Sequence, residues 1–72
     1  MKIVFTWGNK RFIVIQNEPL TEIEIKYIRA NEDEFISHLL ENASLVFVRS
    51  DEGHVGIPHT QFHKYVVTIE YD

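Results

Sequence analysis

Hydrophobic and polar residues alternate over residues 2–7 with the two-residue period of a β-strand. Gly8-Asn9 follows, and because glycine accepts a positive φ and asparagine tolerates one, this pair predicts a two-residue hairpin turn. A second strand then returns beside the first. The turn sets the pairing of the two strands, so Phe5 is expected opposite Phe12.

The middle of the chain carries two further patterns. Segment 21–29 alternates Glu or Lys with Ile or Tyr and predicts a third strand, because its apolar residues would spread around a helix instead of forming one stripe. Asn31, followed three residues later by Glu34, resembles a capping box and predicts the start of a helix that ends near Asn42. The apolar stripe of this helix is expected to pack against the sheet.

The last third of the chain predicts a second hairpin and a final strand. The apolar run 45–49 leads into a turn at 50–53, where glycine takes the left-handed position, and 54–57 returns. One helical turn is expected over 59–63, and the last strand over 66–71.

These elements predict an α+β fold: a mostly antiparallel sheet of five to six strands with one α-helix packed on one face, in the order β-β-β-α-β-β-β. A chain of 72 residues that is 44% hydrophobic supports one core, so residues 1–72 are expected to form a single domain. The absence of cysteine fits a reducing compartment, and no segment resembles a signal peptide or a membrane span. A cytoplasmic protein is therefore expected.

The net charge of −4 is unevenly distributed along the chain. Residues 1–16 contain three basic residues and no acidic one, whereas residues 17–41 contain seven acidic and two basic residues. The acidic total disfavours nucleic acid as a partner but leaves local basic surfaces available.

Patterns of catalytic residues are missing from the sequence. There is no glycine-rich phosphate loop, and the serines, Ser37 beside His38 among them, do not lie in the spacing of a catalytic triad. A chain of this size also offers few walls for a pocket. We therefore expect a protein that is not an enzyme and has no cofactor.

Three of the four histidines, His54, His59 and His63, lie within ten residues. Imidazole binds zinc, nickel and copper, and a spacing of four residues between two histidines suits a metal. The pattern is loose, so a metal-dependent role ranks third among the functions considered.

A sheet-based binder of single-stranded nucleic acid is the second hypothesis. Aromatic side chains on a sheet stack with unpaired bases while basic side chains bind the backbone. Trp7, Lys10, Arg11 and Phe12 have the required chemistry. The same aromatic residues are also needed to fill a small core.

The first hypothesis is a small protein-binding or regulatory module, such as an inhibitor that binds a larger protein through an acidic surface or a sheet edge. The candidate contact residues are Glu22, Glu24, Glu32, Asp33 and Glu34. Because a small core leaves apolar surface uncovered, the partner can also be a second copy of the chain, giving a homo-oligomer.

Overall fold

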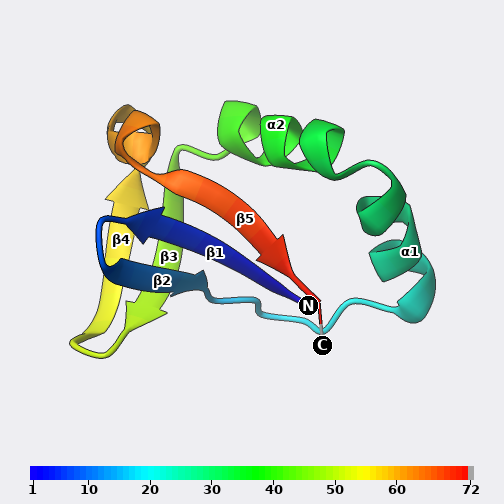
Figure 1. Cartoon of the computed structure of the whole chain (residues 1–72), viewed down its shortest axis with the longest axis horizontal. Helices are drawn as coiled ribbons and strands as arrows, with labels where there is room; N and C mark the ends of the chain where they lie inside the picture. Colours follow the sequence, from blue (N-terminus) through cyan, green and yellow to red (C-terminus); the bar gives the residue numbers. More distant parts are fainter. Residues whose placement is uncertain (72) are drawn as a thin grey trace.

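Five strands form one antiparallel sheet in the order β4-β3-β2-β1-β5 (Figure 1). A computed structural model describes residues 1–71 of the chain. The strands are β1 (Lys2–Trp7), β2 (Lys10–Val14), β3 (Leu45–Ser50), β4 (Gly53–Pro58) and β5 (Val66–Glu70). The helices are α1 (Glu22–Ala30), α2 (Glu32–Asn42) and the 3-10 helix η1 (His59–Lys64). The α+β fold class is confirmed.

Both predicted hairpins are present. Gly8 has a φ of 61° between β1 and β2, and Phe5 lies opposite Phe12 as expected. Gly53 has a φ of 119° at the turn between β3 and β4. Because only glycine adopts these values without steric cost, two short turns determine the register of four of the five strands.

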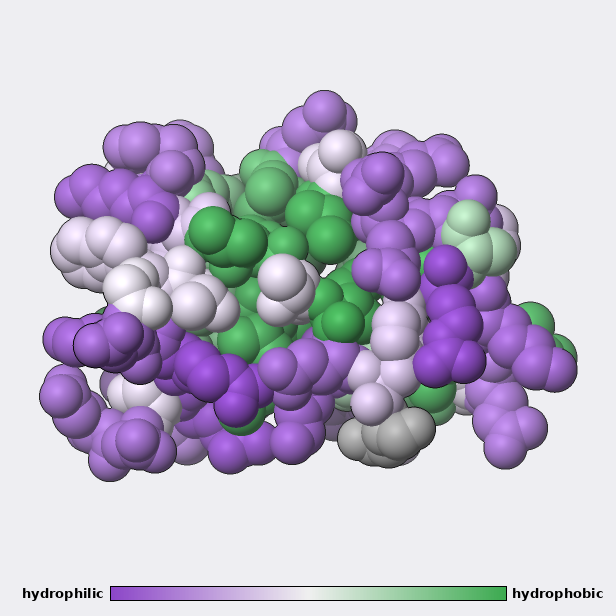
Figure 2. Space-filling model, in the orientation of Figure 1, coloured by the Kyte–Doolittle hydropathy of each residue, from purple (hydrophilic) through white to green (hydrophobic). Residues whose placement is uncertain are grey.

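The core lies on one face of the sheet, where Phe5 and Val48 are completely buried. The rings of Phe5 and Phe62 meet edge to face, with 5.6 Å between centroids, so η1 closes one side of this core. Helix α2 contributes Phe35 and Leu39, which confirms that its apolar stripe packs on the sheet. Figure 2 shows apolar surface gathered over the middle of the molecule, with hydrophilic residues around it.

The expected third strand is wrong, because residues 22–30 form helix α1. Thr21 and Glu24 make a capping box: Thr21 Oγ1 accepts from the Glu24 amide, and Glu24 Oε1 accepts from the Thr21 amide, each at 3.2 Å. This box satisfies two backbone donors that a helix start leaves unpaired. The observed order is therefore β-β-α-α-β-β-η-β, with two helices in place of the single one expected.

The capping box expected at Asn31 is not formed, although helix α2 does begin there. The side chain of Asn31 instead donates from Nδ2 to the carbonyl of Tyr27 at 3.0 Å, which caps the end of the preceding helix. Asn31 thus joins α1 to α2. In the described residues, no helix combines the length and apolar character needed to cross a membrane.

Candidate functional site

The acidic residues of the first hypothesis lie at two separate helix starts. Glu22 and Glu24 lie in the first turn of α1, whereas Glu32, Asp33 and Glu34 lie in the first turn of α2. The two groups lie at opposite ends of α1, whose nine residues span about 13 Å. The structure therefore does not combine them into one acidic patch, and Glu22 and Glu24 do not share the strand face expected for them.

Glu32 is engaged inside the molecule, near the end of the chain. The guanidinium of Arg29 lies over the ring of Tyr71, 4.1 Å from its centroid, and the Tyr71 hydroxyl is shielded from solvent. Burial raises the pKa of Tyr71, the neighbouring Glu32 carboxylate raises it further, and Arg29 opposes both effects. Asp33 and Glu34 remain exposed and available to a partner.

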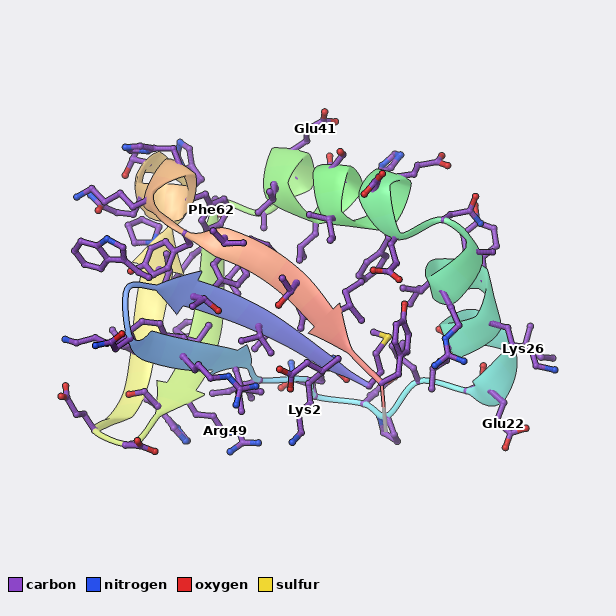
Figure 3. All side chains as sticks on the ribbon, in the orientation of Figure 1. Lys2, Glu22, Lys26, Glu41, Arg49 and Phe62 are labelled. Carbon is purple, nitrogen blue, oxygen red and sulfur yellow. The ribbon has the colours of Figure 1, made fainter. Side chains whose placement is uncertain are left out.

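Helix α1 presents apolar side chains on two sides. Ile28 is buried and attaches the helix to the rest of the molecule, but Ile23 is 80% exposed and Tyr27 is 64% exposed. These two residues are four positions apart and thus lie on one face of the helix. Glu22 and Lys26 also extend outward from this helix (Figure 3). The sequence-based interpretation missed this face because it placed the segment in the sheet.

Two aromatic residues of the nucleic-acid hypothesis pack against a third ring. Tyr65 lies edge to face with both Trp7, at 6.0 Å between centroids, and Phe12, at 5.8 Å. Phe12 is half-buried against the core. Trp7 is more exposed, and the Lys64 ammonium lies over its ring at 5.9 Å. Lys10 pairs with Trp7 across the hairpin, so three of the four residues share this region.

Arg11, the fourth residue of that set, points to the opposite face of the sheet, because side chains alternate along β2. There it forms an ion pair with Glu70 of β5. The structure therefore divides the expected nucleic-acid surface between two faces. Phe12 packs against the core while Trp7 stays 54% exposed, and one cation is already paired with a carboxylate.

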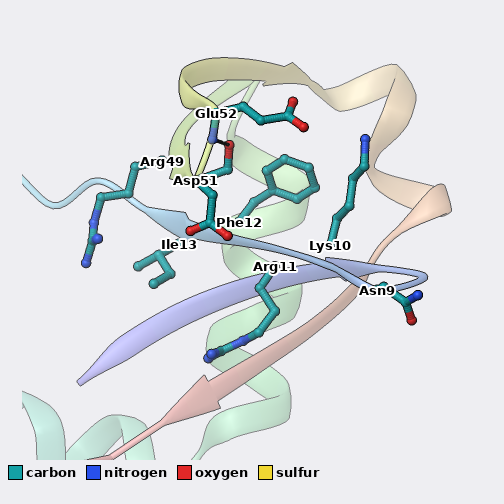
Figure 4. Close-up of a pocket in the computed structure, with 9 residues that line it drawn as sticks. Asn9, Lys10, Arg11, Phe12, Ile13, Arg49, Asp51 and Glu52 are labelled. Carbon is teal, nitrogen blue, oxygen red and sulfur yellow. Dashed lines mark hydrogen bonds between the residues drawn. The ribbon is translucent and has the colours of Figure 1, made fainter.

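A cavity of about 330 Å³ lies where β2 separates from the tip of the β3–β4 hairpin (Figure 4). Lys10 and Arg11 border it on one side, and Asp51 and Glu52 border it on the other. Charges of both signs face the same open space. Arg49 also lines the cavity, so three cations and two carboxylates border it.

The three histidines of the metal hypothesis lie on two elements, His54 on β4 and His59 and His63 on η1. His59 Nδ1 lies 3.3 Å from the carbonyl oxygen of Ser44. Within residues 1–71, no group of three or more His, Asp or Glu side chains is arranged to hold a metal ion. In this part of the chain, the three histidines are therefore not brought together into one cluster of metal ligands.

The outer face of β2, β3 and β4 carries a second exposed surface. Phe47 is 62% exposed there, and Arg49 follows it on the same side of β3. Cross-strand pairing places Arg49 between Ile13 and His54. Comparisons with protein-family models, curated proteins and solved structures found no match. Function is therefore inferred from two surfaces, the outward face of α1 and the outer face of the sheet.

Proposed function

We propose that the chain is a small protein-binding module whose partner docks on the outward face of α1. The observation that carries the proposal is the exposure of Ile23 and Tyr27, at 80% and 64%, on one face of one helix. Large apolar side chains this exposed and this close together mark contact surfaces more often than free surface. The module acts as a regulator or inhibitor of the protein that it binds.

The spacing of the two side chains supports a helix that inserts into a groove. Apolar anchors at positions i and i+4 are the pattern with which short amphipathic helices bind apolar grooves. Tyrosine contributes strongly at interfaces because its rigid ring buries a large area. Ala30, also exposed, extends the same face at position i+7 from Ile23. Ile28 packs inward and leaves this face free to bind.

The surrounding charges define the chemistry of the partner. Glu22 lies beside the apolar face near the start of α1, and Asp33 and Glu34 lie beyond its end. A partner groove with apolar walls and basic residues at its rims complements this surface. The acidic residues then steer the encounter, and the apolar pair supplies most of the affinity. A cysteine-free chain suits the reducing cytoplasm, where we place this interaction.

Site-specific photo-crosslinking in the cell that makes the protein tests the proposal. A benzophenone amino acid replaces Tyr27 in one variant and Glu41 in a control variant. Glu41 is exposed on α2 and points away from α1 (Figure 3). Irradiation is expected to give a discrete adduct from position 27 and none from position 41.

A third variant carries Ile23→Asp together with the crosslinker at position 27. It is expected to lose the adduct, because a charge placed in the centre of an apolar contact is costly. The mass of the adduct separates a second copy of the 8.5 kDa chain from a different protein. Equal labelling from positions 27 and 41 would show that the face of α1 is free surface, and the proposal would be rejected.

A further inference from the structure

The charges of this protein are segregated between sheet and helices. Strands β1 to β4 contain no aspartate or glutamate, and their titratable side chains are Lys2, Lys10, Arg11, Arg49 and His54. Helices α1 and α2 together contain six acidic residues and two basic ones. The acidic total of the chain therefore hides a mostly basic sheet, in which the one carboxylate, Glu70 of β5, pairs with Arg11 and lies opposite Lys2.

The outer face of β3 combines an exposed ring with this positive charge. Phe47 is paired with Gly56 on the edge strand β4, so the residue opposite it contributes no side chain of its own. On the other side the amide of Ile15 donates to the carbonyl of Phe47 at 2.9 Å. Leu45 lies close above Gly56, since a Cβ added there would come within 3.1 Å of its Cδ1. A flat, open apolar platform results around Phe47.

A cavity of about 340 Å³ adjoins this platform and is bordered by cations. Lys2, Arg49 and His54 line it together with the aliphatic Ile13 and Ile15, and its lining contains no carboxylate. Figure 3 shows the Lys2 and Arg49 side chains extending on the same side of the sheet, away from α2. Two permanent charges and one histidine therefore face the same open space next to Phe47.

We propose that this outer face of β2, β3 and β4 binds single-stranded nucleic acid. Phe47 stacks against one base, and Lys2 and Arg49 contact the neighbouring phosphates. Base stacking on an exposed aromatic residue of a sheet, with basic side chains along the backbone, is the common mode of sequence-tolerant single-strand binding. The arginine contributes a planar group with several donors, which suits phosphate oxygens.

The open ring favours a nucleic acid over an acidic protein segment. A peptide strand would pair with a sheet edge through its backbone, whereas Phe47 lies on β3, which has a hydrogen-bonded strand on both sides. A base requires only an exposed flat ring, and Phe47 is 62% exposed. This surface differs from the Trp7, Lys10 and Phe12 region, where the rings pack on Tyr65.

Fluorescence anisotropy with a labelled oligothymidylate tests the proposal, using a strand of about 12 nucleotides, within the range that sheet-based binders cover. Saturable binding is expected at low salt. Phe47→Ala is expected to weaken it about tenfold, the loss typical of one stacked base. Val66→Ala is the matched control, because Val66 is similarly exposed, at 65%, on the distant edge strand β5.

The salt dependence tests the phosphate contacts separately. Each neutralised phosphate of a single strand adds about 0.7 to the slope of log affinity against log salt. Arg49→Gln and Lys2→Gln are therefore each expected to lower that slope by about this amount. The α1 variant Ile23→Asp is expected to bind the strand like the wild type, so this proposal can fail without affecting the proposed protein-binding function.

Four outcomes would overturn the proposal, the last of them from a competition experiment. The first is no saturable binding at low salt, and the second is wild-type affinity in Phe47→Ala. The third is a loss in Trp7→Ala in place of Phe47→Ala, which would move the contact to the other face. Polyglutamate is included as a competitor: displacement of the strand by an equal charge concentration of polyglutamate would show a general anion site and reject recognition of bases.

Discussion

Arg11 and Glu70 form an ion pair that crosses β1, the strand between β2 and β5. The register places Arg11 opposite Thr6, and Glu70 opposite Lys2. The pair therefore passes over Val4, which is only 1% exposed although it lies on the outer face of the sheet. The side chains of Arg11 and Glu70 are 53% and 48% exposed, so their charged ends remain in water.

Removing this ion pair is expected to cost little. Both side chains are about half exposed, and surface pairs of this kind contribute about 0.2–1 kcal/mol. Glu70→Gln should lower the free energy of unfolding in urea by this amount at low salt and by less in about 1 M salt, where screening is strong. Glu41→Gln, on the exposed side of α2, is the control. An equal loss at both salt concentrations would contradict the electrostatic explanation.

Phe5 and Phe47 differ in exposure, so truncating each to alanine should reduce the stability of the fold by very different amounts. Phe5 is completely buried between β2, β5 and the ring of Phe62, so Phe5→Ala is expected to cost about 3–5 kcal/mol, enough to unfold a domain of this size. Phe47 is 62% exposed, so Phe47→Ala should change stability by about 0.5 kcal/mol or less. Urea unfolding followed by Trp7 fluorescence measures both. A large loss in Phe47→Ala would show that its ring is part of the fold.

Local sequence signals predicted the hairpins but not α1. The pairing of Phe5 with Phe12 follows from Gly8-Asn9 and alternation alone, both of which act over a few residues. In segment 21–29 the alternation of glutamate and isoleucine favoured a strand over a helix. Thr21 decided the outcome because it forms a capping box with Glu24 that starts the helix. The apolar residues then do spread around α1, which is why Ile23 is left exposed.

The candidate surfaces depended on contacts that are distant in sequence. The basic character of the first sixteen residues was visible in the sequence, but the pairing of Arg11 with a residue fifty-nine positions away was not. In the same way, Arg49 and His54 join Lys2 around one cavity only because β2 pairs with β3. Long-range strand pairing, which the sequence of one chain does not reveal, determined which charges face the same space.

Loss of the capping box is expected to loosen α1 without unfolding the sheet. Thr21→Ala leaves the Glu24 amide at the start of the helix without its side-chain partner and should cost about 1 kcal/mol. Because α1 packs on the rest of the molecule mainly through Ile28, the cost should appear as faster amide hydrogen exchange within α1. Thr21→Ser keeps the hydroxyl and should restore slow exchange. Equal exchange in Thr21→Ala and the wild type would mean that packing alone holds the helix.

Tyr71 is expected to make the protein less stable in alkali. Burial, and then Glu32, raise the pKa of Tyr71 above its ordinary value of 10.0, so the folded protein binds the phenol proton more tightly than the unfolded chain does. The resulting stability is fully present below the unfolded pKa of about 10 and is lost as the pH rises through the folded pKa.

Urea unfolding at about pH 9 and at about pH 11 measures this loss, with Tyr71→Phe as the control because it keeps the ring near Arg29 but has no proton to release. The wild type should lose more stability between the two pH values than Tyr71→Phe, since only the wild type carries the Tyr71 phenol. The absorbance of phenolate, followed as the pH rises, should show a tyrosine in the wild type that ionises at high pH and that Tyr71→Phe lacks. Identical losses in the two proteins would mean that the hydroxyl is open to water, and that Tyr71 joins the end of the chain to α1 through its ring alone.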